Sequence, residues 1–413
     1  MKEVSAHIDD CLAAVDELPP IDVSLMDAMG CVLARDAVSE VDLPPADLAA
    51  RDGYAVLTDD VAGASRDTPV HLPVTDDITA GQDHTTALTP RTAIRLSSGA
   101  PVPRGTEAVV SIDDTDLGRA EVAITARVSP GQNIRRRAED LETGLAAVAE
   151  GKRIGPRQIA LLAAAGLGSV TVHPAPRVVI MSIGDELIEP GRTGTPASVY
   201  DANAYGLAAA AADAGAVVFR LPAVPDEKSQ LREAITDQLV RADLIVTTGG
   251  LSYGGGDTLK EVLADIGNVR FDRVAIAPGR QYGWGTLPIS KDPEEASEHP
   301  DVPIFCLPGN PAAAFTGFEL FVRPALRKMC GYRHVLRRRL RARAVRGWEC
   351  RYDLPEAVPV RLVGNPSDGY RFEPAGEPGR ELLFGLARAN ALAIAPAGGT
   401  VAVGDWLECV VLD

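Results

Sequence analysis

A glycine-rich segment, residues 247–258, directly follows the apolar run 244–246. It holds five glycines in twelve residues and ends with Asp257 and Thr258, which begin an amphipathic segment. A buried strand that leads into such a loop and then into a helix is typical of phosphate-binding α/β proteins, because glycines let backbone N–H groups approach the anion. A carboxylate beside a phosphate is repulsive unless a cation such as Mg²⁺ lies between them. The segment therefore predicts an anion-binding strand–loop–helix unit, with Asp257 as a candidate metal ligand.

Composition excludes several classes of protein. The net charge of −16 argues against a nucleic-acid partner, which would select a basic face. No run of about 18 apolar residues is present, so we expect no membrane span, and the first residues lack the apolar core of a signal peptide. Six cysteines without CxxC spacing and six dispersed histidines indicate reduced thiols and no zinc site. We therefore expect a cytoplasmic protein, and 413 residues allow about three domains.

The first part of the chain combines helical spacing with strand-like runs. Apolar residues at helical spacing predict helices over 4–15, 25–35 and 157–165, and we expect the last of these to pack on the first two. Short apolar runs separated by turn residues lie between them and predict a β-rich domain. The predicted arrangement is a discontinuous helical linking domain, 1–41 and 144–174, interrupted by a β-rich insertion domain, 42–143.

The second part alternates strands and helices over 175–327. This alternation predicts a doubly wound parallel sheet, with buried strands at 177–182, 216–221, 244–247 and 304–307. From residue 328 the pattern returns to short strands, which predicts a C-terminal β domain, 328–413, that resembles a barrel. The fold class is therefore multidomain α/β.

Four loops that follow the strands of this sheet carry glycines or carboxylates. Ligands of open parallel sheets bind beyond the carboxyl ends of the strands, so we expect these loops to form a metal-assisted site for a phosphorylated ligand. Their acidic residues are Glu186, Asp226 and Asp257. Other interpretations stay open: both aspartates could be helix N-caps, Glu186 could be a first-turn partner of a helix dipole, and residues 308–311 could be a tight turn.

The predicted β-rich insertion contains three further motifs, 52–54, 97–103 and 133–137. The last motif ends in three adjacent arginines. Such a run usually forms a solvated strand face, but a guanidinium also matches the geometry of a phosphate. The three arginines, 135–137, are therefore a candidate anion-binding group.

These pieces together resemble molybdopterin molybdotransferases, the family of bacterial MoeA and the gephyrin E domain. The similarity runs through nearly the whole chain and is carried by motifs in a fixed order. The motifs lie at 42–45, 51–56, 98–103, 132–137, 139–140, 182–187, 200–203, 249–252, 256–257, 275–279 and 307–311.

The resemblance implies a four-part homodimer whose site lies between the doubly wound domain of one subunit and the β insertion of the other. It also implies an enzyme that accepts adenylylated molybdopterin, inserts molybdate at the dithiolene and releases AMP with Mg²⁺. A molybdopterin adenylyltransferase and apo-molybdoenzymes are then the possible partners.

The resemblance also assigns site residues. The catalytic set is Asp52, Ser98, Glu186, Asp226 and Asp257. Three of these, Glu186, Asp226 and Asp257, form the metal-binding set. The substrate-binding set is Arg137, Gly249, Gly250, Ser252, Arg280, Pro308, Gly309, Asn310 and Pro311.

Departures from the family pattern concentrate where the second anion, molybdate, is expected. The family's Lys-Pro-Gly-Lys-Pro reads Ala277-Pro-Gly-Arg280-Gln281, so one lysine is lost while Arg280 keeps a charge. The serine-bearing C-terminal motif is replaced near residues 379–383. The nucleotide and metal side therefore matches the family and the oxyanion side is rebuilt. The alternative function is a catalytically weak paralogue that binds molybdopterin or its nucleotide and delivers it to a specific molybdoenzyme.

Overall fold

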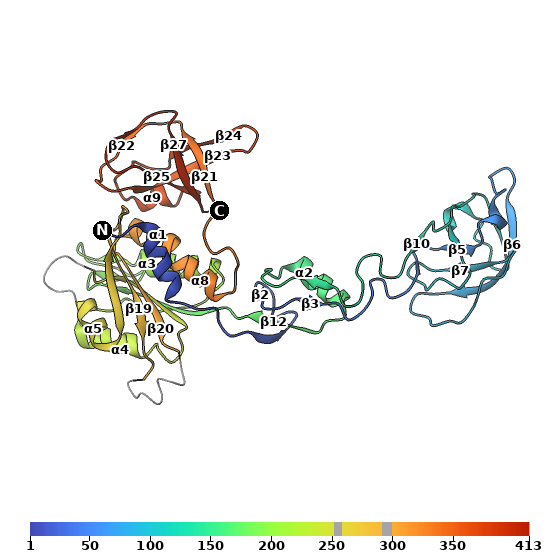
Figure 1. Cartoon of the computed structure of the whole chain (residues 1–413), viewed down its shortest axis with the longest axis horizontal. Coiled ribbons are helices and arrows are strands. Elements are labelled where there is room, and N and C mark those ends of the chain that lie inside the picture. Colours follow the sequence, from blue (N-terminus) through green and yellow to red (C-terminus); the bar gives the residue numbers. More distant parts are fainter. Residues whose placement is uncertain (252–257, 291–299, 413) are drawn as a thin grey trace. The chain divides into compact units, whose positions relative to one another are not determined.

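The computed structural model describes residues 1–251, 258–290 and 300–412 (Figure 1). The chain divides into two compact units. The first unit comprises residues 1–21, 30–34 and 172–413, and the second comprises 22–29 and 35–171. Every helix within the described ranges is too short or too polar to span a bilayer.

A six-stranded sheet forms the centre of the first unit. Its strand order is β16 (Val217–Arg220), β13 (Arg177–Ile183), β17 (Leu244–Gly249), β20 (Val302–Leu307), β19 (Gln281–Leu287) and β18 (Asn268–Arg273). The first four strands are parallel, as the alternation predicts, whereas β19 pairs antiparallel with both β20 and β18. The doubly wound domain is thus confirmed, and β19 and β18, which extend it through antiparallel pairings, are an addition that the alternation does not predict.

Helices cover both faces of this sheet because its central strands are apolar on both sides. On β13, Val178 and Ile180 pack in one core while Val179 and Met181 pack in another. The first core includes α3 (Ala202–Asp213) and the second includes α4 (Lys228–Thr236). The other helical segments of the first unit are α1 (Val4–Ala13), α5 (Thr258–Ile266), α7 (Pro311–Gly317), the π-helical η3 (Phe318–Val322), α8 (Arg323–Met329) and α9 (Leu383–Leu386).

A closed five-stranded barrel ends the first unit, in agreement with the predicted C-terminal domain. Its order is β21 (Arg339–Ala344), β24 (Gly369–Pro374), β23 (Glu356–Asn365), β25 (Ala391–Ala395) and β27 (Trp406–Val411). Phe372, Val360 and Cys409 are fully or almost fully buried inside it. Short pairs accompany these sheets: β14 (Leu187–Ile188) with β15 (Val199–Tyr200), and β22 (Trp348–Glu349) with β26 (Thr400–Val401).

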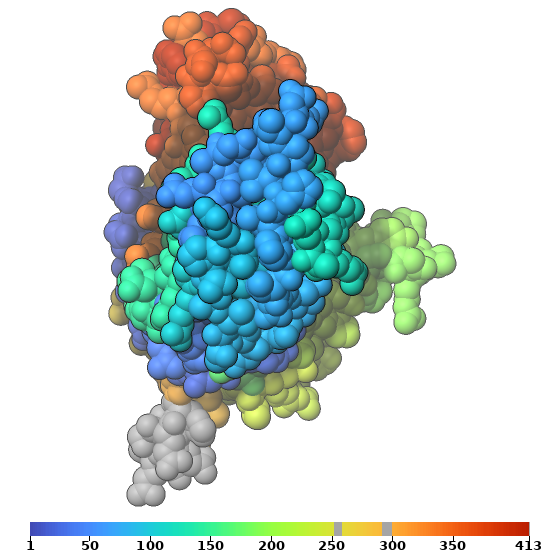
Figure 2. All heavy atoms as spheres, turned by 90° about the vertical axis from the view of Figure 1, so that its right-hand side faces the viewer, coloured from blue at the N-terminus to red at the C-terminus, as the bar shows by residue number. Residues whose placement is uncertain are grey.

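The second unit contains a five-stranded sheet with a core on each face. Its order is β8 (Ala108–Ser111), β5 (Gly53–Val56), β7 (Ala93–Leu96), β6 (Val70–Ile78) and β9 (Glu121–Ile124). Figure 2 views the face of this sheet domain that carries β6, whose side chains alternate in exposure. Its remaining elements are β3 (Ala37–Val38), β4 (Leu48–Ala49), β10 (Ile134–Arg135), β11 (Ala146–Val148), α2 (Pro156–Ala164) and the 3₁₀ turns 59–61 and 112–114. The division between the units falls within β1 (Ile21–Ser24) and β12 (Ser169–His173), and β2 (Val32–Leu33) belongs to the first unit.

One helix predicted from the sequence is wrong. Residues 25–30 form turns, and β2 follows at Val32. The hydroxyl of Ser24 accepts a hydrogen bond from the backbone N–H of Asp27, and Gly30 adopts a left-handed φ of 88°. Met26 is also 77% exposed, so its apolar side chain does not belong to the buried face of a helix.

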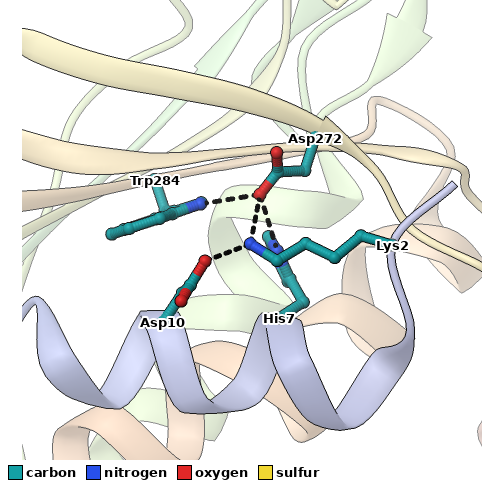
Figure 3. Close-up of polar contacts among 5 residues, drawn as sticks. All are labelled: Lys2, His7, Asp10, Asp272 and Trp284. Atoms are coloured by element: carbon teal, nitrogen blue, oxygen red, sulfur yellow. Dashed lines mark hydrogen bonds and ion pairs between the residues drawn. The ribbon is translucent and has the colours of Figure 1, made fainter.

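The N-terminal helix packs elsewhere than expected. Instead of packing with α2, α1 places Ile8 and Cys11 in the core of the α/β sheet. A polar cluster fixes it there (Figure 3), in which Asp272 Oδ2 accepts bonds from Lys2 Nζ at 2.8 Å and Trp284 Nε1 at 3.0 Å. His7 Nδ1 lies 3.2 Å from the same oxygen, and burial lowers the pKa of this histidine. The cluster joins the start of the chain to β18 and β19.

We expect Asp272→Ala to lower the free energy of unfolding by roughly 2–3 kcal/mol, because it removes a charged acceptor shared by three partly buried donors. Urea unfolding followed by tryptophan fluorescence measures the change. The matched control is Asp265→Ala on α5, which removes exposed ion pairs with Arg232 and Lys228 of α4 and is expected to cost less than about 1 kcal/mol. Equal losses in the two variants would contradict a specific role for this cluster.

Candidate functional site

Three parallel strands end at one edge of the six-stranded sheet. Ile183 at the end of β13 pairs with Gly249 at the end of β17, and Thr248 pairs with Leu307 at the end of β20. Beyond these ends lies a cavity of about 290 Å³. Residues from all four predicted loops of this edge line it, including Gly184, Glu186, Asp226, Gly249, Gly250 and Gly309. The structure therefore brings these predicted site residues together.

The described start of the glycine loop requires glycine for steric reasons. Gly249 and Gly250 have φ angles of 90° and 66°, a conformation that other residues rarely adopt. A Cβ atom on Gly249 would lie 2.3 Å from the carbonyl oxygen of Ile183. The predicted residues Ser252 and Asp257 lie outside the described residues. The loop thus holds the backbone of β17 against β13 at the cavity edge.

Two carboxylates line the cavity and are not used as helix caps. The cap of α4 is Glu227, whose side chain accepts hydrogen bonds from the N–H groups of Ser229 and Gln230. The bonds from the hydroxyl and N–H of Ser229, with that from Gln230, hold the pKa of Glu227 at about 2. Asp226 is therefore not the N-cap, although capping was one interpretation of its position. Its backbone N–H donates to Asp185 Oδ1 at 3.1 Å, which positions the loop.

Glu186 lies in a turn before β14 rather than in the first turn of a helix. Its side chain folds back over Gly184, since a Cβ atom there would lie 2.7 Å from Glu186 Oε2. Its interpretation as a partner of a helix dipole is therefore wrong. The glutamate is available to a ligand in the cavity.

The floor of the cavity contains Asn203, to which sequence reasoning assigned no role. Its Nδ2 donates to Gly309 O at 2.7 Å and to Thr248 Oγ1 at 2.9 Å, and Thr248 Oγ1 donates to Pro308 O at 2.8 Å. Asp201 caps α3 and accepts a bond from Ser182 Oγ at 2.7 Å, which fixes the helix start beside β13. The sequence did offer one signal for Asn203, because it lies two residues after Asp201, the N-cap of α3.

The segment 308–311 begins a helix as well as bordering the site. Asn310 caps α7 by accepting from the N–H of Ala313 at 3.2 Å, and Pro311 is the first helical residue. Gly309 lines the cavity, and Pro308 supplies the carbonyl that Thr248 contacts. Binding of substrate by Pro308, Asn310 and Pro311 stays a prediction.

The candidate residues of the β insertion belong to the second unit. Ser98 donates its N–H to Asp52 Oδ1 at 2.7 Å, so these two predicted residues are neighbours. Arg137 is 68% exposed at its side chain, and its Nε donates to Asp42 Oδ2. Hydrogen bonds from Thr143 and then from Arg137 hold the pKa of Asp42 at about 2. The guanidinium is therefore oriented by a carboxylate that stays ionised.

The segment 277–281, where the second anion was expected, runs beside the C-terminal barrel. Ala277 is buried, donates its N–H to Pro355 O at 2.8 Å and accepts from the N–H of Ala357 at 2.7 Å. Gly279 has a φ of 83°, and a Cβ atom there would lie 2.6 Å from the hydroxyl oxygen of Tyr282. Arg280 does not line the 290 Å³ cavity. The role of Arg280 in binding substrate stays a prediction.

Three family models match successive parts of the chain. They are described as the MoeA N-terminal region (domain I and II), which matches residues 2–166, a probable molybdopterin binding domain, 179–328, and the MoeA C-terminal region (domain IV), 341–412.

Individual proteins give the same result. Molybdopterin molybdenumtransferase 2 of Mycobacterium tuberculosis is 38% identical over 337 residues, 80% of each chain. Molybdopterin molybdenumtransferase 1 of the same organism is 36% identical over 398 residues, which cover 92% of this chain and 91% of the relative. A crystal structure of the molybdopterin biosynthesis MoeA protein from Pyrococcus horikoshii superposes with a TM-score of 0.80 at 26% identity, covering 100% of this chain and 99% of that chain.

Proposed function

Because the chain belongs to the MoeA family of molybdopterin molybdenumtransferases, we propose that it inserts molybdate into adenylylated molybdopterin with Mg²⁺-dependent release of AMP. The family places it in molybdenum cofactor biosynthesis as a transferase. The 290 Å³ cavity supports the proposed reaction. At this edge of the sheet it brings together two carboxylates and a turn whose close backbone approach only glycine allows.

The cavity offers the two kinds of group that a phosphoanhydride needs. The backbone of Gly249 and Gly250 carries no side chain, so phosphate oxygens can approach it closely. The side-chain amide of Asn203 holds the carbonyl group of Gly309 in place. In the proposed reaction a water molecule adds to one phosphorus, the bridging P–O bond breaks, and AMP leaves. Molybdate is the second substrate and binds the dithiolene sulfurs of the pterin product.

The donor set at the cavity fits a magnesium ion. Mg²⁺ prefers oxygen ligands and is commonly held by one or two carboxylates together with substrate phosphates. Glu186 and Asp226 supply two such carboxylates, and Asp257 would supply a third from outside the described residues. When bound, Mg²⁺ neutralises phosphate charge.

A reconstitution assay tests the proposed function. The gene is expressed in a strain that lacks its own molybdotransferase, molybdate is titrated, and the activity of a resident molybdoenzyme is measured. We expect rescue, with a higher molybdate requirement than that of a relative with lysines in the 277–281 segment. Lack of rescue at every molybdate concentration would contradict turnover.

One observation favours a second candidate function. Ala277 stands where the family has a lysine, and it adjoins a cavity whose described charged lining residues are glutamates. This supports a catalytically weak paralogue that binds molybdopterin or its nucleotide and delivers it to a specific molybdoenzyme. Tight binding of adenylylated molybdopterin without release of AMP is the result that this function predicts, and normal turnover would exclude it.

We also propose a cytoplasmic homodimer, in which Asp52, Ser98 and Arg137 of one subunit serve the cavity of the other. The support is the position of these three residues in a unit separate from the one that holds the cavity. Mixing an Asp52→Asn subunit with an Asp226→Asn subunit is expected to restore part of the lost activity, because one of the two sites in the mixed dimer is then intact.

A further inference from the structure

A small cavity lies between the segment 277–281 and the C-terminal barrel. Three parts of the first unit line it: Pro278 of the segment, Thr316 of α7, and the barrel with its 376–382 loop. Its volume is about 30 Å³. A polar cavity needs about 10–15 Å³ to hold one water, so this one takes a ligand of the size of one or two waters.

The charge on the wall of this cavity is negative. Among its described lining residues, the charged ones are Glu356, Glu377 and Glu381. Glu381 Oε1 accepts a hydrogen bond from the hydroxyl of Tyr352 at 2.6 Å. Glu377 forms ion pairs with Arg380 at 3.3 Å and Arg351 at 3.6 Å. An anion in this cavity would meet like charges at short range.

Glu356 is the buried member of this set, with 4% of its surface exposed. Its Oε1 accepts from the N–H of Gly379 at 2.9 Å, but its Oε2 is buried without a hydrogen-bond partner among the described residues. Burial raises the pKa of Glu356, and the charge of Glu381 adds to this, whereas the backbone N–H of Gly379 and both the charge and the backbone N–H of Arg351 oppose it. A buried carboxylate oxygen without a partner is unfavourable, so either a proton or a cation beside it would stabilise the position.

We propose that this cavity binds a monovalent cation of about the size of a water molecule, potassium or ammonium, with Glu356 as its charged ligand. The volume excludes a hydrated ion or an organic cation. A caged divalent ion is disfavoured because Glu356 is the one buried carboxylate among the described residues that line the cavity, and such an ion needs several charged oxygen ligands. The residues that line this cavity are separate from those that line the 290 Å³ cavity, so the inference does not rest on the proposed site of AMP release.

A bound cation would strengthen the contact between the segment 277–281 and the barrel. The two are already joined by the backbone bonds between Ala277 and residues 355 and 357. Glu356 lies between these two bonded residues, so a cation beside it neutralises charge at the junction. The site therefore links ionic conditions to the position of the rebuilt oxyanion segment.

Thermal unfolding in different chloride salts tests the proposal. At equal ionic strength and pH 7.5, potassium or ammonium chloride is expected to raise the midpoint of the full chain by about 2–5 °C relative to tetramethylammonium chloride, which is too large for the cavity. Glu356→Gln is expected to remove the difference between salts. The control Glu373→Gln, an exposed glutamate on β24 of the same barrel, is expected to keep it.

Three outcomes would overturn the proposal. One is the absence of a salt-specific shift in the wild-type chain. Another is stabilisation by molybdate that Glu356→Gln abolishes, because this would make the cavity an oxyanion site. The last is the result expected if a proton is the only partner of Glu356. The unfolding midpoint would then fall as the pH rises through the raised pKa of Glu356 in the folded state, and it would fall equally in all the salts.

A second measurement does not depend on the variant folding. Crystals of the wild-type chain are soaked in rubidium chloride, and anomalous scattering locates the ion, because Rb⁺ substitutes for potassium. We expect a peak in direct contact with Glu356 Oε2. A cavity without a peak at saturating rubidium would overturn the assignment.

Discussion

Replacing Asp226 by asparagine is expected to slow AMP release from adenylylated molybdopterin by roughly 10²–10³-fold, a magnitude typical of losing one charge-stabilising group. The carboxylate lines the 290 Å³ cavity, whereas the adjacent Glu227 caps α4. The substitution therefore removes a charge from the site and leaves the helix cap intact. A single-turnover assay at saturating Mg²⁺ measures the rate.

The control for this prediction is Glu233→Gln on the exposed face of α4, which keeps the same helix and removes the same charge elsewhere. We expect its rate to equal that of the wild type. Unfolding midpoints of both variants within about 2 °C of the wild type would establish that the fold is preserved. Unchanged AMP release in Asp226→Asn would contradict the role of this carboxylate.

Gly249→Ala is expected to abolish ligand binding and to lower the free energy of unfolding by roughly 2–4 kcal/mol. The φ of 90° at this position disfavours any side chain, and the added Cβ would lie 2.3 Å from Ile183 O. The backbone must shift, and with it the turn that borders the cavity. Binding of adenylylated molybdopterin by titration calorimetry and unfolding by urea measure the two effects.

Gly168→Ala is the matched control, because Gly168 has no left-handed φ and a Cβ there meets nothing within 4 Å. We expect it to bind normally and to unfold at the same urea concentration or a slightly higher one. Normal ligand binding by Gly249→Ala would show that the close approach of β17 to β13 is not required at this site.

The spacing of apolar residues along the sequence predicted those strands whose residues form one continuous apolar run. The four parallel strands are continuous apolar runs bounded by turn residues, so their sequence period and length identify them. The antiparallel strand β19 was missed because Gly283 and Gly285 weaken the strand signal. Both glycines are required by the fold: a Cβ on Gly285 would lie 2.1 Å from Asn268 O of the adjacent β18.

Long-range contacts account for what the sequence did not predict in the candidate site. Asn203 shares the cavity floor with Gly309, which follows it by more than a hundred residues along the chain. Glu356 joins the segment 277–281 through a bridge between Ala277 and β23 that no local pattern encodes. The helix predicted over 25–35 failed because exposed methionines have the spacing of an apolar face without being buried.

The central claim is that this chain couples molybdate insertion to hydrolysis of the pterin nucleotide. The most direct measurement is release of AMP from purified adenylylated molybdopterin by the wild-type chain, with molybdate and Mg²⁺ supplied separately and together. We expect rapid release when both are present and little release when either is omitted. Binding of the nucleotide without release of AMP in the presence of both would contradict the claim and identify the chain as a binding and delivery protein.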